Sequence, residues 1–94
     1  MRILNRGVLA NFCRKHPDCR KWISHWISEV ESSRWESTHD IKRQFRSASL
    51  LPEKIVIFNV RGNEYRIETQ ISYVTGAVLI KWCGTHDQYT KRMH

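Results

Sequence analysis

Residues 54–71, KIVIFNVRGNEYRIETQI, decide the fold because they predict two strands joined by a tight turn. In residues 54–60 both alternating sets of side chains are largely apolar, which is typical of a strand in the middle of a sheet. In residues 64–71 apolar and polar side chains alternate strictly, which predicts one buried face and one polar face. Between them, Gly62 and Asn63 are expected to supply the positive φ angles of the turn.

A third strand is predicted at residues 77–83, AVLIKWC, after a turn at Gly76. Strict alternation gives it two faces, with Val78, Ile80 and Trp82 on one and Ala77, Leu79, Lys81 and Cys83 on the other. Because the three strands follow one another through short turns, we expect them to form an antiparallel meander.

The first half of the chain reads as helical. The predicted elements are an edge strand at 2–5 and helices at 7–15, 19–32 and 38–46. Pro17 separates the first two helices, and Asp18 is a candidate N-cap for the second. That helix carries an apolar stripe, made of Trp22, Ile23, Trp26, Ile27 and Val30, which predicts a face buried in the core. Ser37 and Asp40 resemble a capping box at the start of the third helix.

A second capping box follows the last strand directly. Thr85 and Gln88 have the required spacing and predict a short C-terminal helix. The order of helices followed by strands indicates an α+β fold, a single domain over residues 1–94 whose N-terminal helices pack on one face of an antiparallel sheet.

Composition limits the function further. The chain has 94 residues and a net charge of +7, which leaves no room for a separate cofactor-binding domain and favours a polyanionic partner such as nucleic acid. A basic but otherwise ordinary soluble surface is the alternative. No stretch is long and apolar enough for a membrane span, and the start, MRILNRG, lacks the apolar region of a secretory signal. We therefore expect a cytoplasmic protein without membrane association.

The cysteines predict neither a disulfide framework nor, in our interpretation, a metal site. Cys13, His16 and Cys19 have the spacing C-x2-H-x2-C, which leaves a structural zinc site open as an alternative. No C-x2-C pair completes it, so we interpret Cys13 as a small core residue and His16 as the end of a helix before Pro17.

Four residues near the end of the sheet could form a phosphate site. His86 and Tyr89 are three residues apart on the predicted terminal helix and so point to the same side. Arg66 and Lys81 lie on neighbouring strands and would add two cations if they share a face. Alternatively, His86 and Tyr89 belong to a helix cap on the surface. Arg66 and Lys81 would then be solvated side chains that pair with acidic residues on the neighbouring strands.

The sequence resembles the HigB family of type II toxins, within the RelE-like superfamily. The matching stretches are VIFNVRGNEYRI (56–67) and GAVLIKWCGTHDQYTK (76–91), which fit the family patterns V-F-N-[IV]-x-G-N-x-[YL]-R and Y-I-[RK]-x-x-x-T-H-x-x-Y-D. In the first half the resemblance rests on His16, Pro17, Trp26, Val30, Trp35, Asp40, Lys42, Phe45, Ala48 and Ser49.

This resemblance implies a RelE-like fold and an mRNA interferase, an endoribonuclease that acts on translated messages, commonly at the ribosome. It also implies a HigA-type antitoxin with a helix-turn-helix fold. The implied catalytic residues are Arg66, Lys81, His86 and Tyr89, with Arg61, Lys42 and Arg46 expected to hold flanking RNA, and no cofactor or metal is expected. Thr90 replaces the family's aspartate after the tyrosine.

Two other functions remain compatible with the sequence. A basic module could bind RNA or the ribosome and block translation without cleavage, since the same electrostatics serve both roles. A protein-interaction domain whose basic face is neutralised by an acidic partner is the third interpretation.

Overall fold

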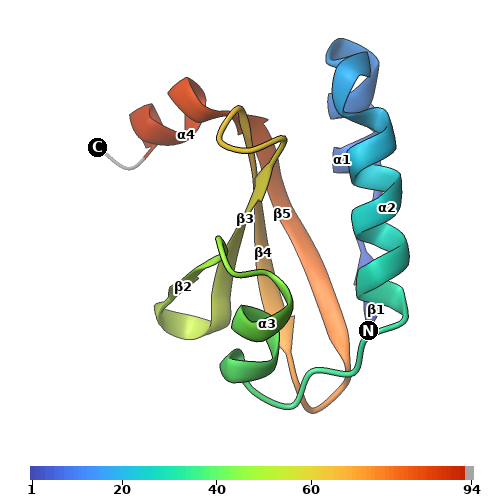
Figure 1. The fold of residues 1–94 in the computed structure, drawn as a ribbon, viewed down its shortest axis with the longest axis vertical. Coiled ribbons are helices and arrows are strands. Elements are labelled where there is room, and N and C mark those ends of the chain that lie inside the picture. Colours follow the sequence, from blue (N-terminus) through green and yellow to red (C-terminus); the bar gives the residue numbers. More distant parts are fainter. Residues whose placement is uncertain (93–94) are drawn as a thin grey trace.

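The computed structural model describes residues 1–92 and contains a five-stranded sheet with the order β1-β5-β4-β3-β2 (Figure 1). Its elements are β1 (Arg2–Leu4), α1 (Gly7–Lys15), η1 (Pro17–Cys19), α2 (Arg20–Glu31), α3 (Thr38–Gln44), β2 (Ser49–Leu51), η2 (Pro52–Lys54), β3 (Ile55–Val60), β4 (Tyr65–Ser72), β5 (Ala77–Thr85) and α4 (His86–Arg92). The α+β prediction is confirmed.

The meander of β3, β4 and β5 is antiparallel, as predicted, but the whole sheet is mixed. The predicted edge strand β1 pairs in parallel with β5, with Ile3 opposite Val78. The short strand β2 was not predicted, because Ser49–Leu51 is too short to show a period and stands next to Pro52. It pairs with β3 and makes β3 an interior strand, as its two apolar faces indicated.

The core lies between one face of the sheet and the helices α1, α2 and α3. Aromatic rings hold its centre: the Phe58 ring on β3 meets the rings of Trp26 and Phe45, each at a centroid distance of 5.2 Å in T-shaped contact. Trp35, in the segment between α2 and α3, is also buried and stacks on Phe58. The apolar stripe of α2 therefore faces the sheet, and in Figure 1 α3 lies in front of the strands.

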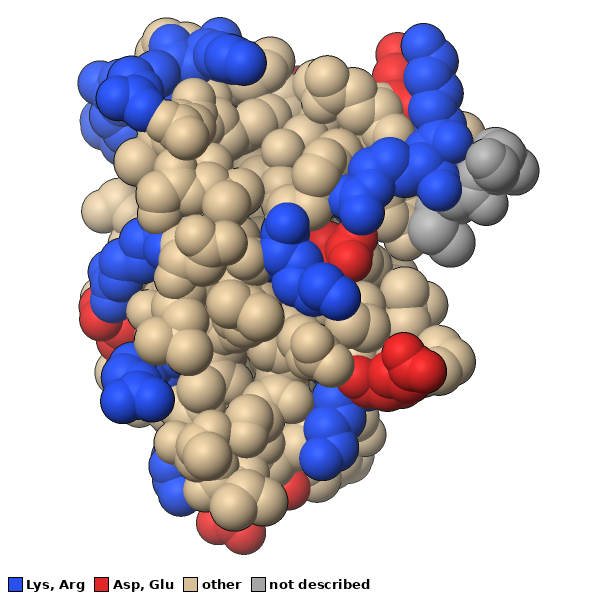
Figure 2. Space-filling view, turned by 180° about the vertical axis from the view of Figure 1, so that it is seen from behind, with Lys and Arg blue, Asp and Glu red and all other residues tan. Residues whose placement is uncertain are grey.

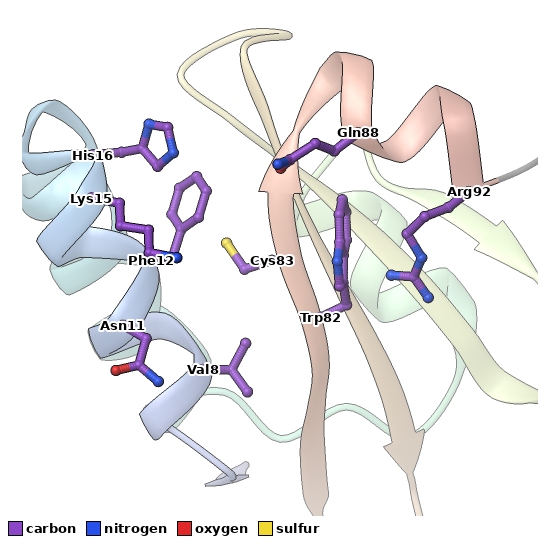
Figure 3. Close-up of a pocket in the computed structure, with 9 residues that line it drawn as sticks. All are labelled: Val8, Asn11, Phe12, Lys15, His16, Trp82, Cys83, Gln88 and Arg92. Atoms are coloured by element: carbon purple, nitrogen blue, oxygen red, sulfur yellow. The ribbon is translucent and has the colours of Figure 1, made fainter.

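A β-bulge in β5 overturns the predicted faces of this strand. Ile67 of β4 pairs with Cys83, whereas Thr69 pairs with Ile80, so β5 holds one residue more than β4 over this stretch. The extra residue shifts the alternation by one position. Cys83 therefore joins the core side, and Trp82 lies on the opposite side of β5, next to Arg92 (Figure 3).

Two local predictions are also wrong, one at the β3–β4 turn and one at the start of α2. At the β3–β4 turn, positive φ occurs at Arg61 and Gly62, at 49° and 67°, and not at Asn63. Asp18 does not cap α2, which has no side-chain cap. Its carboxylate instead accepts hydrogen bonds from the Tyr65 hydroxyl, at 2.8 and 3.1 Å, and pairs with Arg61.

None of the helices in residues 1–92 is long and apolar enough to cross a membrane. Cys13 is a buried core residue and His16 ends α1, as predicted. The sulfurs of Cys13 and Cys19 are 3.9 Å apart, and the ring of His16 stacks on that of Phe12.

Candidate active site

The candidate site lies where β4 begins, β5 ends and α4 starts. The capping box of α4 is confirmed in both directions: the Thr85 amide donates to Gln88 Oε1 at 2.9 Å, and the Gln88 amide donates to Thr85 Oγ1 at 3.1 Å. The amide of His86 donates to the carbonyl of Glu64 at 2.9 Å, which ties the start of α4 to the β3–β4 turn. The helix is therefore fixed to the sheet at its first residue.

Arg66 and Tyr89, both predicted site residues, are brought together by this arrangement. The guanidinium carbon of Arg66 lies 5.9 Å from the centre of the Tyr89 ring. Two further bonds, from Arg66 Nη1 to the carbonyls of Asn63 at 3.0 Å and Tyr65 at 3.3 Å, orient the guanidinium. It is half-buried and pairs with no carboxylate within residues 1–92, so its charge is available to a phosphate.

Next to this pair lie two residues that were not predicted as site residues, Trp82 and Arg92. The Trp82 ring is 6.2 Å from the Tyr89 ring, and the Arg92 guanidinium carbon lies 4.5 Å from the centre of the Trp82 ring. Arg92 also pairs with Glu68 at 3.3 Å. We call Arg66, Glu68, Trp82, Tyr89 and Arg92 together the arginine–aromatic cluster.

Sequence reasoning missed Trp82 because regular alternation assigned it to the face of Val78 and Ile80. The bulge moved it, and no turn residue marks a bulge at this place. A signal for Arg92 existed: it is three residues after Tyr89 and so shares its side of α4.

His86 and Lys81 lie near the cluster, although neither contacts it directly among the described interactions. His86 is exposed at the first position of α4, beside the β3–β4 turn. Lys81 is exposed at the bulge, opposite the step from Glu68 to Thr69, where the register shifts. Three of the four predicted catalytic residues, Arg66, His86 and Tyr89, therefore lie at one end of the sheet, with Arg66 and Tyr89 in contact. Lys81 lies in the middle of β5, away from this end.

The three residues expected to hold flanking RNA are more scattered. Lys42 on α3 donates to the carbonyl of Ala48 at 2.6 Å, and Arg46 is exposed in the loop that follows. In Figure 1, α3 lies at the opposite end of the sheet from α4. Arg61 is in the β3–β4 turn, where its guanidinium pairs with Asp18 and, at 3.6 Å, with Glu64.

The Asp18–Tyr65 contact at the base of the β3–β4 turn shifts the pKa values of both groups away from neutral pH. The hydrogen bond from Tyr65, followed by the charge of Arg61, lowers the pKa of Asp18 below its usual value. The same hydrogen bond to Asp18 raises the pKa of Tyr65 to about 12. Both groups therefore keep their bonding forms, carboxylate and phenol, throughout the neutral range.

A cleft of about 460 Å³ separates α1 from the start of α4 (Figure 3). Its lining includes Phe12, Lys15 and His16 of α1, Trp82 and Cys83 of β5, and Gln88 of α4. Burial raises the pKa of the Cys83 thiol to about 12, so its sulfur is uncharged at neutral pH. The cleft is thus mixed in character, with aromatic walls and basic and amide groups at its margins.

Seen from behind, on the side away from α3, lysine and arginine side chains lie on both sides of an acidic side chain near the centre (Figure 2). This view agrees with the net charge of +7 and shows no continuous acidic surface. Within residues 1–92, no group of three or more histidine, cysteine, aspartate or glutamate side chains is placed to hold a metal ion.

Comparison with protein families gives a match. The family model HigB_toxin, described as the RelE-like toxic component of a toxin–antitoxin system, matches residues 19–92. The match includes β2 to β5 and α4, and therefore every residue of the arginine–aromatic cluster. No curated protein sequence matches the chain.

Proposed function

Because the chain belongs to the HigB family of RelE-like toxins, we propose that it is an endoribonuclease that cleaves translated mRNA and thereby inhibits translation in the cytoplasm. The family assignment makes the chain the toxin of a toxin–antitoxin system, which has an antitoxin as its partner. The proposal adds the reaction, the mRNA substrate, the ribosome as its place of action, and a HigA-type helix-turn-helix antitoxin.

RNA carries its own nucleophile, so the proposed reaction requires no metal ion. The 2′-hydroxyl attacks the adjacent phosphorus in line, the bond to the 5′-oxygen of the next nucleotide breaks, and a 2′,3′-cyclic phosphate and a 5′-hydroxyl result. The protein has to align these groups, accept the proton of the 2′-hydroxyl, donate one to the leaving oxygen, and stabilise the additional negative charge on the phosphate.

We assign these tasks to three residues at the end of the sheet and to Lys81 in the middle of β5. Arg66 binds phosphate oxygens through its planar fork and Lys81 adds a point charge. The His86 imidazole and the Tyr89 hydroxyl transfer protons. Lys42, Arg46 and Arg61 are assigned to the flanking RNA backbone, where their contribution should weaken as salt is added.

The observation that carries the proposal is the environment of the Arg66 guanidinium. Its guanidinium is oriented by two backbone carbonyls, contacts Tyr89, and is free of any carboxylate in the described part of the chain. An arginine held in this way, beside a phenol and at the start of a helix that carries a histidine, is arranged for an anion that is not part of the protein.

Cleavage of a translated message in the presence of EDTA tests the proposal. We expect Arg66→Ala to lower the single-turnover rate by about 10²–10³, the usual effect of removing one such donor, and Arg66→Lys to restore part of it. Arg43→Ala is the matched control, because Arg43 is an exposed arginine on α3 that pairs only with Asp40. A rate for Arg66→Ala within a few fold of that of Arg43→Ala would exclude Arg66 from the site.

One observation favours the second candidate, a module that blocks translation without cleavage. Thr90, which replaces the family's aspartate, donates its hydroxyl to the carbonyl of His86 at 3.0 Å and so bonds within its own helix. The protein thus offers no carboxylate at that position. Intact mRNA on arrested ribosomes, with wild-type protein present, would support this candidate over the nuclease.

A further inference from the structure

We propose that Trp82 is a stacking platform for one nucleobase of single-stranded RNA, beside the phosphate held by Arg66. This inference rests on the proposed function, because it adds a base-binding subsite to the same surface. It starts from the bulge in β5, which places a large aromatic ring on the side of the sheet that bears Arg66 instead of in the core.

A glycine in β5, Gly84, leaves space for the Trp82 ring. A Cβ atom at Gly84 would lie 2.3 Å from Trp82 Cζ2 and 2.5 Å from Trp82 Cη2, so only glycine leaves room for the indole against the strand. One side of the ring is therefore supported by β5, and the other side is available to a ligand or to a neighbouring side chain. This geometry presents a flat surface, as base stacking requires.

At present Arg92 covers the outer side of the ring, at 4.5 Å from its centre. Guanidinium groups and nucleobases are both flat and stack on the same aromatic surfaces, so Arg92 occupies the place that a base would take. It is held there by an ion pair with Glu68, in which the Arg92 side chain is 43 % exposed and the Glu68 side chain 18 % exposed. Because the arginine of this pair is partly exposed, solvent screens its charge, and Arg92 can exchange Glu68 for an RNA phosphate when a base arrives.

The neighbours of Trp82 place this base next to the cleavage site. The Tyr89 ring is 6.2 Å from the Trp82 ring, and the guanidinium carbon of Arg66 lies 5.9 Å from the centre of the Tyr89 ring. A nucleotide stacked on Trp82 therefore has its phosphate within reach of the arginine to which we assign phosphate binding. RNA that is single-stranded and unstacked fits this geometry, whereas bases inside a duplex do not expose their faces.

Binding of a non-cleavable RNA tests the platform separately from the reaction. Two probes of equal length are compared, a 2′-O-methyl oligonucleotide with bases and an abasic one with the same backbone. Trp82→Leu should weaken binding of the base-containing probe about 5- to 150-fold, the usual effect of losing one base stack. Binding of the abasic probe should stay within about twofold.

Trp22→Leu is the matched control, since Trp22 is a half-buried tryptophan on α2 and should change neither affinity. Trp82→Phe keeps a smaller ring and should retain part of the preference for bases, which guards against a folding defect in the leucine variant. Equal binding of both probes by the wild type would overturn the platform, as would an unchanged base preference in folded Trp82→Leu.

The outcomes also separate this proposal from the nuclease. A wild type that prefers the base-containing probe through Trp82 but cuts no RNA keeps the platform and loses the nuclease. A wild type that cuts RNA but shows no base preference keeps the nuclease and loses the platform.

Discussion

Replacing Gly84 with alanine should both destabilise the protein and disturb the candidate site. The new methyl group would lie 2.3 Å from Trp82 and 2.7 Å from Gln88 Oε1, about 1 Å closer than ordinary van der Waals contact. The indole has to move outward, at a cost of ~1–3 kcal/mol for overpacking. Displacing Gln88 weakens the capping box by a further ~0.5–1 kcal/mol.

Alanine also restricts the unfolded chain, which returns ~0.4–1 kcal/mol. The net loss in the free energy of unfolding is then ~1–3 kcal/mol, and for a domain of this size the melting temperature should fall by roughly 5–20 °C. Thermal unfolding followed by circular dichroism measures this shift. Near-ultraviolet spectra should also change, because the surroundings of one of the four tryptophans change.

Gly7→Ala is the matched control, because a Cβ there meets no atom within 4 Å and Gly7 begins a helix. It should raise stability by ~0.4–1 kcal/mol. The clash with Trp82 is tested by repeating Gly84→Ala in a Trp82→Leu background, where its cost should drop. A melting temperature of Gly84→Ala within about two degrees of the wild type would refute the seating of Trp82 on Gly84.

Three further results are expected. Thr85→Ala should lower the free energy of unfolding by ~1 kcal/mol through the lost cap, with a modest loss of activity. His86→Gln should leave the melting temperature unchanged and lower the single-turnover cleavage rate by about 10²–10⁴. The free energy of unfolding should fall as pH rises from 10 toward 12, because the unfolded chain releases the Tyr65 proton at lower pH than the folded chain does. It should also fall in acid, as Asp18 is protonated. Tyr65→Phe should reduce both pH dependences, which thermal melts across the pH range measure. Expression of the chain alone should arrest growth, and a neighbouring helix-turn-helix protein should relieve the arrest; unimpaired growth with soluble toxin would contradict this.

The elements that sequence reasoning predicted well have strong periodic patterns. The α2 stripe and the alternation in β4 both bury one face, so their patterns and their positions in the fold agree. The capping box of α4 was predictable because both of its bonds join residues three apart in the sequence. Arg66 and Tyr89 followed from the family motifs and are in contact.

The errors arise where distant parts of the chain decide local geometry. The bulge in β5 exists because the strand has to match β4, and nothing within residues 77–83 announces it. Asp18 has the residue type and position of an N-cap, yet the hydroxyl of Tyr65, 47 residues away, competes for its carboxylate. Because the bulge was not predicted, Trp82 was assigned to the wrong face of β5, and the proposed platform could not be predicted from the sequence.

The parallel pairing of β1 with β5 has a consequence for how the protein is made. Arg2 of β1 pairs with Ala77 of β5, so β1 can form this pair only after the ribosome has translated 75 further codons. At about 5–20 residues per second this delay lasts roughly 4–15 s. Contacts this remote in sequence also slow folding, because the chain loses entropy when so long a loop closes. The nascent chain therefore has no completed sheet to support the candidate site while those codons are still being translated.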